Sequence, residues 1–181
     1  MNVNTMNLSF ICKFSSPTNS VVVDSATGER LFEFATPFGL HWRTVTTLRD
    51  AQSNVVGEHK SGWTRDEVTY QGRTMLMSDW LVKKGLSSRF VPRGLFVAGM
   101  QHLLDCQTGA LVARGHRKRT RLFSSSGEKL NIDVPPDGLP LLDAIVFSFF
   151  LCELMARRKE SANNGFGVGG AGMQLGAPIS G

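Results

Sequence analysis

Short runs of alternating apolar and polar residues fill most of the chain and then give way to one long apolar run. A first strand is predicted over residues 8–14, where Leu8, Phe10, Cys12 and Phe14 share one face. Further short runs follow about every ten residues, each bounded by turn-forming residues. This spacing is typical of an antiparallel sheet folded as a sandwich or a barrel.

Three of the predicted hairpins share one turn chemistry. An Asp ends the first strand of each, and a Gly or Asn stands four residues later. The carboxylate can accept backbone N–H groups inside the turn, and Gly or Asn tolerates the positive φ that closes a bulged hairpin. The repetition predicts a meander of hairpins with these turns: Asp24 to Gly28, Asp50 to Asn54 and Asp105 to Gly109.

Other short elements lie between and after these hairpins. A tighter hairpin is predicted over 67–77, with its turn at Gln71-Gly72, and a short helical turn over 80–84. The remaining strands are predicted over 89–91, 95–98, 122–123 and 129–134.

The long apolar run, Leu139–Ala156, is predicted as the core of a helix over about 138–159. Asp137 is the expected N-cap, and Pro140 is compatible with a first helical turn. The composition divides the chain into a flexible leader (1–7), one domain (8–160) and a Gly-rich tail (161–181) predicted to be disordered.

A helix without a polar face must be enclosed by lipid or by protein. The apolar segment spans about 27 Å, slightly less than the roughly 30 Å of a bilayer core. Asp143 and Glu153 lie within it, and each acid would cost up to about 3 kcal/mol in a membrane. We therefore expect no transmembrane span and predict that the strands wrap around the helix.

In that arrangement the apolar helix residues fill a barrel. Asp143, Ser148 and Glu153 should then lie near its mouths or find hydrogen-bond partners inside it. The residues predicted to fill the barrel are Leu142, Ile145, Val146, Phe147, Phe149, Phe150 and Leu154.

The repeated Asp-x-x-x-Gly turns followed by a hydrophobic C-terminal helix resemble the tubby C-terminal-like superfamily, which includes phospholipid scramblases and LURP-one-related proteins. That resemblance implies a closed antiparallel barrel of about twelve strands around a central helix. A more specific resemblance, over roughly residues 8–160, is to the uncharacterised DUF6593 family of fungal, mostly basidiomycete, proteins. It is carried by the stretches 14–20, 24–33, 46–50 and 138–143. Such a resemblance implies a fold more than a function.

The charge balance is mildly basic, with a net charge of +5 and a pI of about 9.4. The densest basic run is 114–121, and its candidate anion-binding residues are Arg114, His116, Arg117, Lys118, Arg119 and Arg121. A solvated strand end is one reading of this run. The functional reading is an anionic phospholipid or phosphoinositide surface, which tubby proteins bind through basic residues. A nucleic-acid partner is not favoured, because no aromatic platform accompanies the run.

The remaining residues leave the function classes open. The three cysteines and the lack of a signal-peptide pattern predict a cytoplasmic protein, at most peripherally attached to a membrane. No spaced His or Cys pair predicts a metal, no cofactor motif is present, and no nucleophile signature names a catalytic residue. A non-enzymatic module that binds lipid or a protein partner is the first hypothesis. A small hydrolase or ligand-binding enzyme and a structural or assembly protein are the alternatives.

Overall fold

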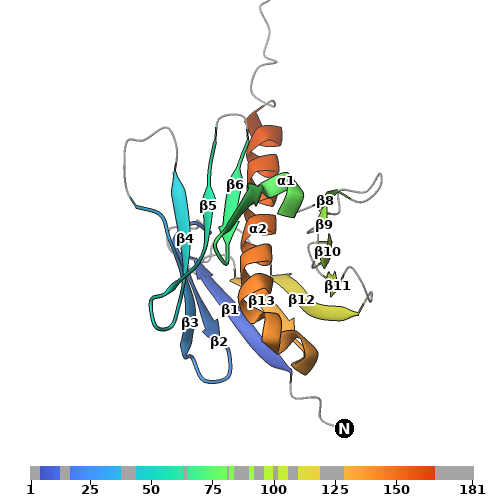
Figure 1. Ribbon diagram of the computed structural model, residues 1–181. Helices are drawn as coiled ribbons and strands as arrows, with labels where there is room; N and C mark the ends of the chain where they lie inside the picture. Colours follow the sequence, from blue (N-terminus) through green and yellow to red (C-terminus); the bar gives the residue numbers. More distant parts are fainter. Residues whose placement is uncertain are drawn as a thin grey trace, which may run out of the picture.

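A rolled antiparallel sheet surrounds one long helix in the computed structural model (Figure 1). The structure describes residues 5–12, 17–37, 44–62, 65–80, 82–83, 90–91, 96–99, 102–105, 110–118 and 129–165. The mainly β prediction with a C-terminal helix is confirmed within these ranges.

The first group of strands precedes a short helix, and the second group leads to the long one. The first group is β1 (Met6–Cys12), β2 (Ser20–Asp24), β3 (Arg30–Ala35), β4 (Val45–Asp50), β5 (Val55–Lys60), β6 (Glu67–Tyr70) and β7 (Arg73–Leu76). The second is β8 (Val82–Lys83), β9 (Phe90–Val91), β10 (Phe96–Gly99), β11 (His102–Asp105), β12 (Leu111–Lys118) and β13 (Lys129–Val134). The helical segments are α1 (Met77–Trp80), the 3₁₀ helix η2 (Pro136–Leu141) and α2 (Leu142–Gly165).

The sheet consists of two meanders, β1–β7 and β8–β13, which are joined by the pairing of β1 with β13. Its order is β7-β6-β5-β4-β3-β2-β1-β13-β12-β11-β10-β9-β8. The first strand therefore pairs with the last, and Leu8 lies opposite Ile132 in an antiparallel register. The two meanders lie on either side of α2 (Figure 1).

The prediction of a closed barrel is wrong. The sheet has thirteen strands in the described ranges instead of about twelve, and its two ends, β7 and β8, are not paired there. The chain passes between them through α1, which contacts β6, β7 and β8. The buried indole of Trp80 at the end of α1 lies against Tyr70 and Phe147. A helical turn with a buried aromatic side chain thus links the two ends of the sheet in the chain.

The predicted turn chemistry is confirmed at two hairpins. The Asp24 carboxylate accepts the Ala26 N–H at 2.8 Å, and Gly28 has the positive φ of 75°. Asp50 accepts the Asn54 N–H at 2.8 Å, but the positive φ falls on Ser53 instead of Asn54. The register shifts in both strand pairs, as a bulged hairpin requires. The third turn, 106–109, lies outside the described residues.

The α2 helix is enclosed on every side along its middle. Residues 144–151 are all buried, and a run of that length covers more than two helical turns. Ile145, Val146, Phe147, Phe149 and Phe150 are buried in the interior of the sheet. The predicted residues at the two ends, Leu142 and Leu154, are only partly buried. The segment Pro136–Lys159 is long and apolar enough to cross a membrane by composition, and here it forms the core of the fold.

Both ends of the helix differ from the prediction. Residues 136–141 form a 3₁₀ helix capped by Pro135 without a side-chain bond, so the prediction of Asp137 as the N-cap is wrong. Two prolines near this segment, Pro136 and Pro140, supply no N–H for regular α-helical bonds. At the other end the helix continues to Gly165, into the predicted tail. Residues 1–4, the predicted strand 122–123 and residues 166–181 lie outside the described ranges.

A continuous series of aromatic rings connects α2 to the first meander. The rings of Phe34 and Phe150 stack with centroids 4.2 Å apart, and Phe10 stacks on Phe34 at 6.0 Å. Phe147 extends the series from Phe150 to Tyr70. Each such ring pair adds about 0.5–1.5 kcal/mol beyond the burial of its area.

The polar side chains within the apolar part of α2 have hydrogen-bond partners, as expected. The Trp80 indole N–H donates to the Ser148 hydroxyl at 3.3 Å. Glu153 accepts from the Arg157 guanidinium at 2.6 Å. Burial, the hydrogen bond to Asp143 and the charge of that carboxylate together raise the pKa of Tyr70, which remains a neutral donor.

Replacing Phe150 by Ala should destabilise the domain by about 3–5 kcal/mol, because a fully buried ring leaves a cavity that the sheet cannot collapse to fill. Urea denaturation monitored by tryptophan fluorescence measures the change. Leu139→Ala is the control, since Leu139 is 40% exposed and its loss should cost less than about 0.5 kcal/mol. Equal destabilisation by the two variants would contradict the enclosed helix.

Candidate functional site

The predicted basic run occupies the exposed face and the end of β12. Arg114 and His116 are exposed on the outer face of the sheet. Arg117 and Lys118 complete the strand, and Arg119 and Arg121 lie outside the described residues. The structure therefore places two of the six candidate side chains, Arg114 and His116, together on one surface.

Strand alternation divides the run in a way that the sequence pattern did not show. Gly115 is buried between exposed Arg114 and exposed His116. Because successive strand positions face opposite sides, Arg114 and His116 share the outer face of β12 and Gly115 lies on the inner face.

The neighbouring strands add polar groups to this outer face. His116 Nε2 lies 2.6 Å from Asp133 Oδ2 on β13, and both side chains are partly exposed. Ser9 on β1 donates to Asn131 Oδ1 at 3.0 Å and shares a 2.8 Å hydrogen bond with Ser25. A polar band therefore crosses β12, β13 and β1 and continues to the turn after β2.

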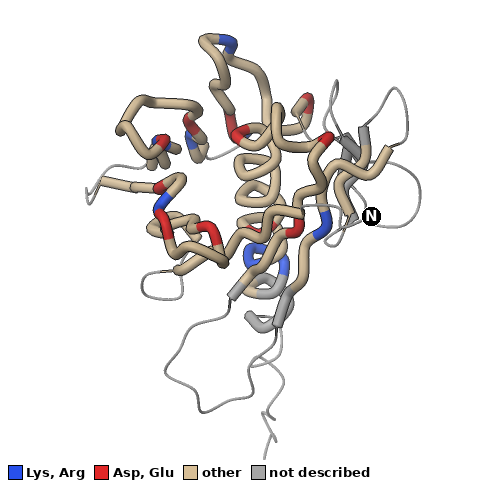
Figure 2. Tube along the Cα trace, turned by 90° about the horizontal axis from the view of Figure 1, so that it is seen from below, with Lys and Arg blue, Asp and Glu red and all other residues tan. Residues whose placement is uncertain are grey.

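Charges of both signs are distributed around the described strands. In Figure 2 the turns of the α2 helix lie within the surrounding strands, and Lys and Arg positions are interspersed with Asp and Glu positions. An anion-binding surface among the described residues must therefore be local, because cationic and acidic positions alternate there.

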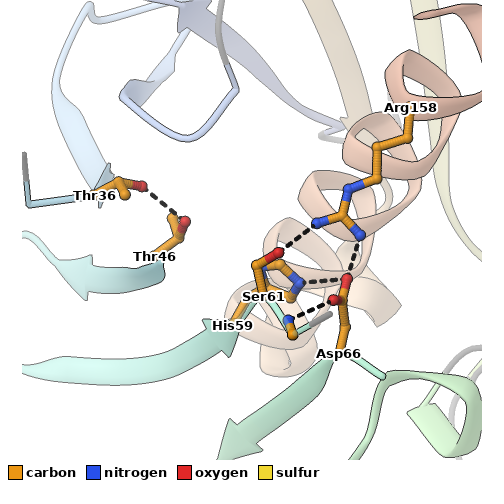
Figure 3. A network of polar contacts seen from close by, with 7 residues as sticks. Thr36, Thr46, His59, Ser61, Asp66 and Arg158 are labelled. Carbon is orange, nitrogen blue, oxygen red and sulfur yellow. Dashed lines mark hydrogen bonds and ion pairs between the residues drawn. The ribbon is translucent and has the colours of Figure 1, made fainter. Parts of the chain in front are cut away.

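A second polar cluster, which we name the helix clasp, consists of His59, Ser61, Gly62, Asp66 and Arg158. All of these except Gly62 are labelled in Figure 3. The carboxylate of Asp66 accepts from Gly62 N–H at 3.0 Å and lies 3.1 Å from His59 Nε2. Arg158, on the last turns of α2, donates to Asp66 and to the Ser61 hydroxyl at 3.1 Å. The clasp joins the helix to β5 and to the segment before β6.

The electrostatics of the clasp favour a neutral imidazole beside an ionised carboxylate. Burial lowers the pKa of His59, and this effect outweighs the opposing influence of Asp66. Burial by itself raises the pKa of Asp66, but the Gly62 N–H, Arg158 and His59 together bring it below its usual value. The His59 and Asp66 side chains are only 2% and 6% exposed, so these groups are largely shielded from solvent.

The clasp has the residue types of a hydrolytic triad without the required geometry. The Ser61 hydroxyl bonds to Arg158, and the bonded nitrogen of His59 faces the carboxylate. A nucleophilic serine would need the imidazole within hydrogen-bond reach. The arrangement therefore fits a structural link between helix and sheet. The sequence offered no signal for it, because Asp66 and Arg158 are 92 residues apart.

A small pocket opens beside the same end of the helix, with room for about one water molecule. Its walls are mainly apolar, with the Glu153–Arg157 ion pair at one side. The residues around it are Phe10, Cys12, Pro17, Leu130, Phe150, Glu153 and Arg157.

The histidines and cysteines do not gather into a metal site in the part of the chain that the structure describes. No group of three or more His, Cys, Asp or Glu side chains there has a metal-binding arrangement. His59 belongs to the clasp, His102 and His116 lie on the outer face, and His41 lies outside the described ranges.

The architecture defines a mainly β protein whose sheet encloses a C-terminal helix. Comparison with protein families matches residues 15–158 to the "Family of unknown function (DUF6593)". The chain belongs to this family, which confirms the predicted resemblance to DUF6593. No curated protein and no solved structure matches the chain.

The lowered pKa of His59 predicts a stability that declines in mild acid. Below about pH 6.5, the usual pKa of a histidine, His59 gains a proton in the unfolded chain but not yet in the folded protein. The free energy of unfolding therefore decreases as the pH is lowered. Urea titrations at pH 7.5, 6.5 and 5.5 measure this slope. His59→Gln should reduce it, while His102→Gln, at an exposed position, should retain it. A wild-type stability that rises toward pH 5.5 would show that Asp66 raises the pKa of His59 by more than burial lowers it.

Proposed function

We propose that this protein is a non-enzymatic module that binds anionic lipid headgroups through the outer face of β12. The exposure of Arg114 and His116 on the same side of that strand carries the proposal. The strand is paired on both edges, with β11 and β13, so these side chains project from a rigid support. A fixed array of cationic and N–H groups suits phosphate oxygens.

The filled interior supports a binding role for the exterior. The α2 helix occupies the space inside the sheet, and the pocket beside it has room for about one water molecule. A ligand of headgroup size would therefore meet the described part of the protein on its outer surface. The corresponding location is the cytoplasm, with peripheral attachment to an anionic membrane.

We also infer a distant relationship to the tubby C-terminal-like superfamily. A sheet wrapped around a hydrophobic C-terminal helix supports this relationship. The unpaired ends of the sheet at β7 and β8 distinguish this chain from the closed barrel that the resemblance implied.

Vesicle flotation tests the proposed function, with phosphatidylcholine vesicles that contain phosphatidylserine or a phosphoinositide, over a salt series. Substituting Arg114, His116 and Lys118 by Ala should weaken binding by about 30-fold, since each lost Lys or Arg contributes about 1 kcal/mol. The matched control replaces Arg65 and Arg73 by Ala, which removes the same two formal charges from exposed positions in the first half of the chain. An equal loss in both variants, or no flotation of the wild type at low salt, would refute the proposal.

A further inference from the structure

The outer face of the second meander carries a group of titratable and charged residues aligned by strand register, which we name the cross-strand patch. It consists of His102 on β11, Arg114 and His116 on β12, and Asp133 on β13. Arg114 lies directly opposite His102 on one side and Asp133 on the other. His102, Arg114 and His116 are exposed, and the side chain of Asp133 is 36% exposed. Pairing on both edges of β12 fixes this order of residues.

Within the cross-strand patch, Asp133 is the single carboxylate. It lies 2.6 Å from His116 and therefore holds a position where an anionic ligand would otherwise contact the imidazole. The side chain of Arg114, its register neighbour, has no hydrogen-bond or ion-pair partner among the residues that the structure describes. One cationic group of the patch is thus open to a ligand, and the second donor is already engaged by an internal anion.

The surroundings of Asp133 contain further hydrogen-bonding groups but no second described acid at its register positions. Asn7 lies opposite it on β1, and Arg114 lies opposite it on β12. The next row contains Ser9, Asn131 and His116, which offer hydroxyl, amide and imidazole groups. An anionic headgroup on this face would meet attractive groups at every one of these positions except Asp133.

We propose that Asp133 is an internal counter-anion that sets the affinity of this face, and that an anionic lipid headgroup displaces its carboxylate from His116. This inference rests on the proposed function and adds a specificity-determining residue to it. Two anions beside one another repel, while an anion beside the guanidinium and imidazole is stabilised. The carboxylate therefore opposes headgroup binding in two ways, by its own charge and by occupying His116. It limits binding to surfaces with a high density of negative charge.

The Asp133→Asn variant tests this role because the amide has the shape of the carboxylate without its charge. Flotation with vesicles of phosphatidylcholine and phosphatidylserine should show binding about fivefold tighter than wild type, as expected for the removal of one repulsive charge at the surface. Binding to pure phosphatidylcholine vesicles should remain absent. Asp133→Ser is the second variant, and circular dichroism with thermal unfolding verifies that both proteins are folded.

Glu67→Gln is the matched control. Glu67 is also a partly exposed strand carboxylate next to a cation, Lys60 at 3.7 Å, but it lies on β6 in the other meander. The Glu67→Gln substitution changes the net charge of the protein by the same amount as Asp133→Asn, and it lies outside the cross-strand patch. A similar gain in both variants would show a general charge effect and would overturn the role of Asp133.

The remaining outcomes separate the inference from the proposed function. Wild-type flotation with no gain for Asp133→Asn or Asp133→Ser would leave the lipid-binding role intact and overturn the counter-anion. If only the Asp133 variants float at low salt, the counter-anion is supported, and the lipid-binding function proposed for the wild-type protein is refuted because the carboxylate blocks the surface. If wild type and all variants fail to float at low salt, both the lipid-binding function and the inference are wrong.

Discussion

The fold depends on the requirement that α2, a helix without a polar face, be excluded from water on every side. Eight consecutive buried residues, 144–151, show that the sheet meets this requirement by surrounding the helix. The two meanders complete the enclosure together with the buried indole of Trp80 and the aromatic series through Phe150. The polar atoms of the helix are tolerated inside because Ser148 and Glu153 each have a hydrogen-bond partner.

Local chemistry made much of this architecture predictable. Asp24 and Asp50 identified their turns, since a carboxylate that bonds backbone N–H groups acts within a few residues. The closure of the sheet was not predictable in the same way. The chain between β7 and β8 runs through α1, whose Trp80 packs against Tyr70 and Phe147, and no periodicity encodes such contacts. The 3₁₀ start of the helix similarly reflects the combined effect of Pro136 and Pro140.

The surface illustrates the same division between local and non-local information. The basic run was visible in the sequence, but its neighbours in space were not. Register brings Asp133 and His102 beside Arg114, and these residues determine what charge the face presents. The helix clasp was equally hidden, because its members are brought together only when the end of α2 meets β5. Contacts between segments that are far apart in the sequence determine the chemistry of both the cross-strand patch and the helix clasp. Patterns in a single sequence do not contain such contacts.

The pairing of β1 with β13 has a consequence for how the molecule is made. Ser9 and Asn131 are hydrogen-bonded neighbours separated by 122 positions, and the helix that fills the interior follows β13 in the chain. During synthesis the early hairpins therefore leave the ribosome without their core, and a largely non-local topology slows folding. Until α2 emerges, the inward faces of these hairpins remain open to solvent or to other chains. Timely release of the last segment, or protection by a chaperone, would govern how much of the newly made protein escapes aggregation.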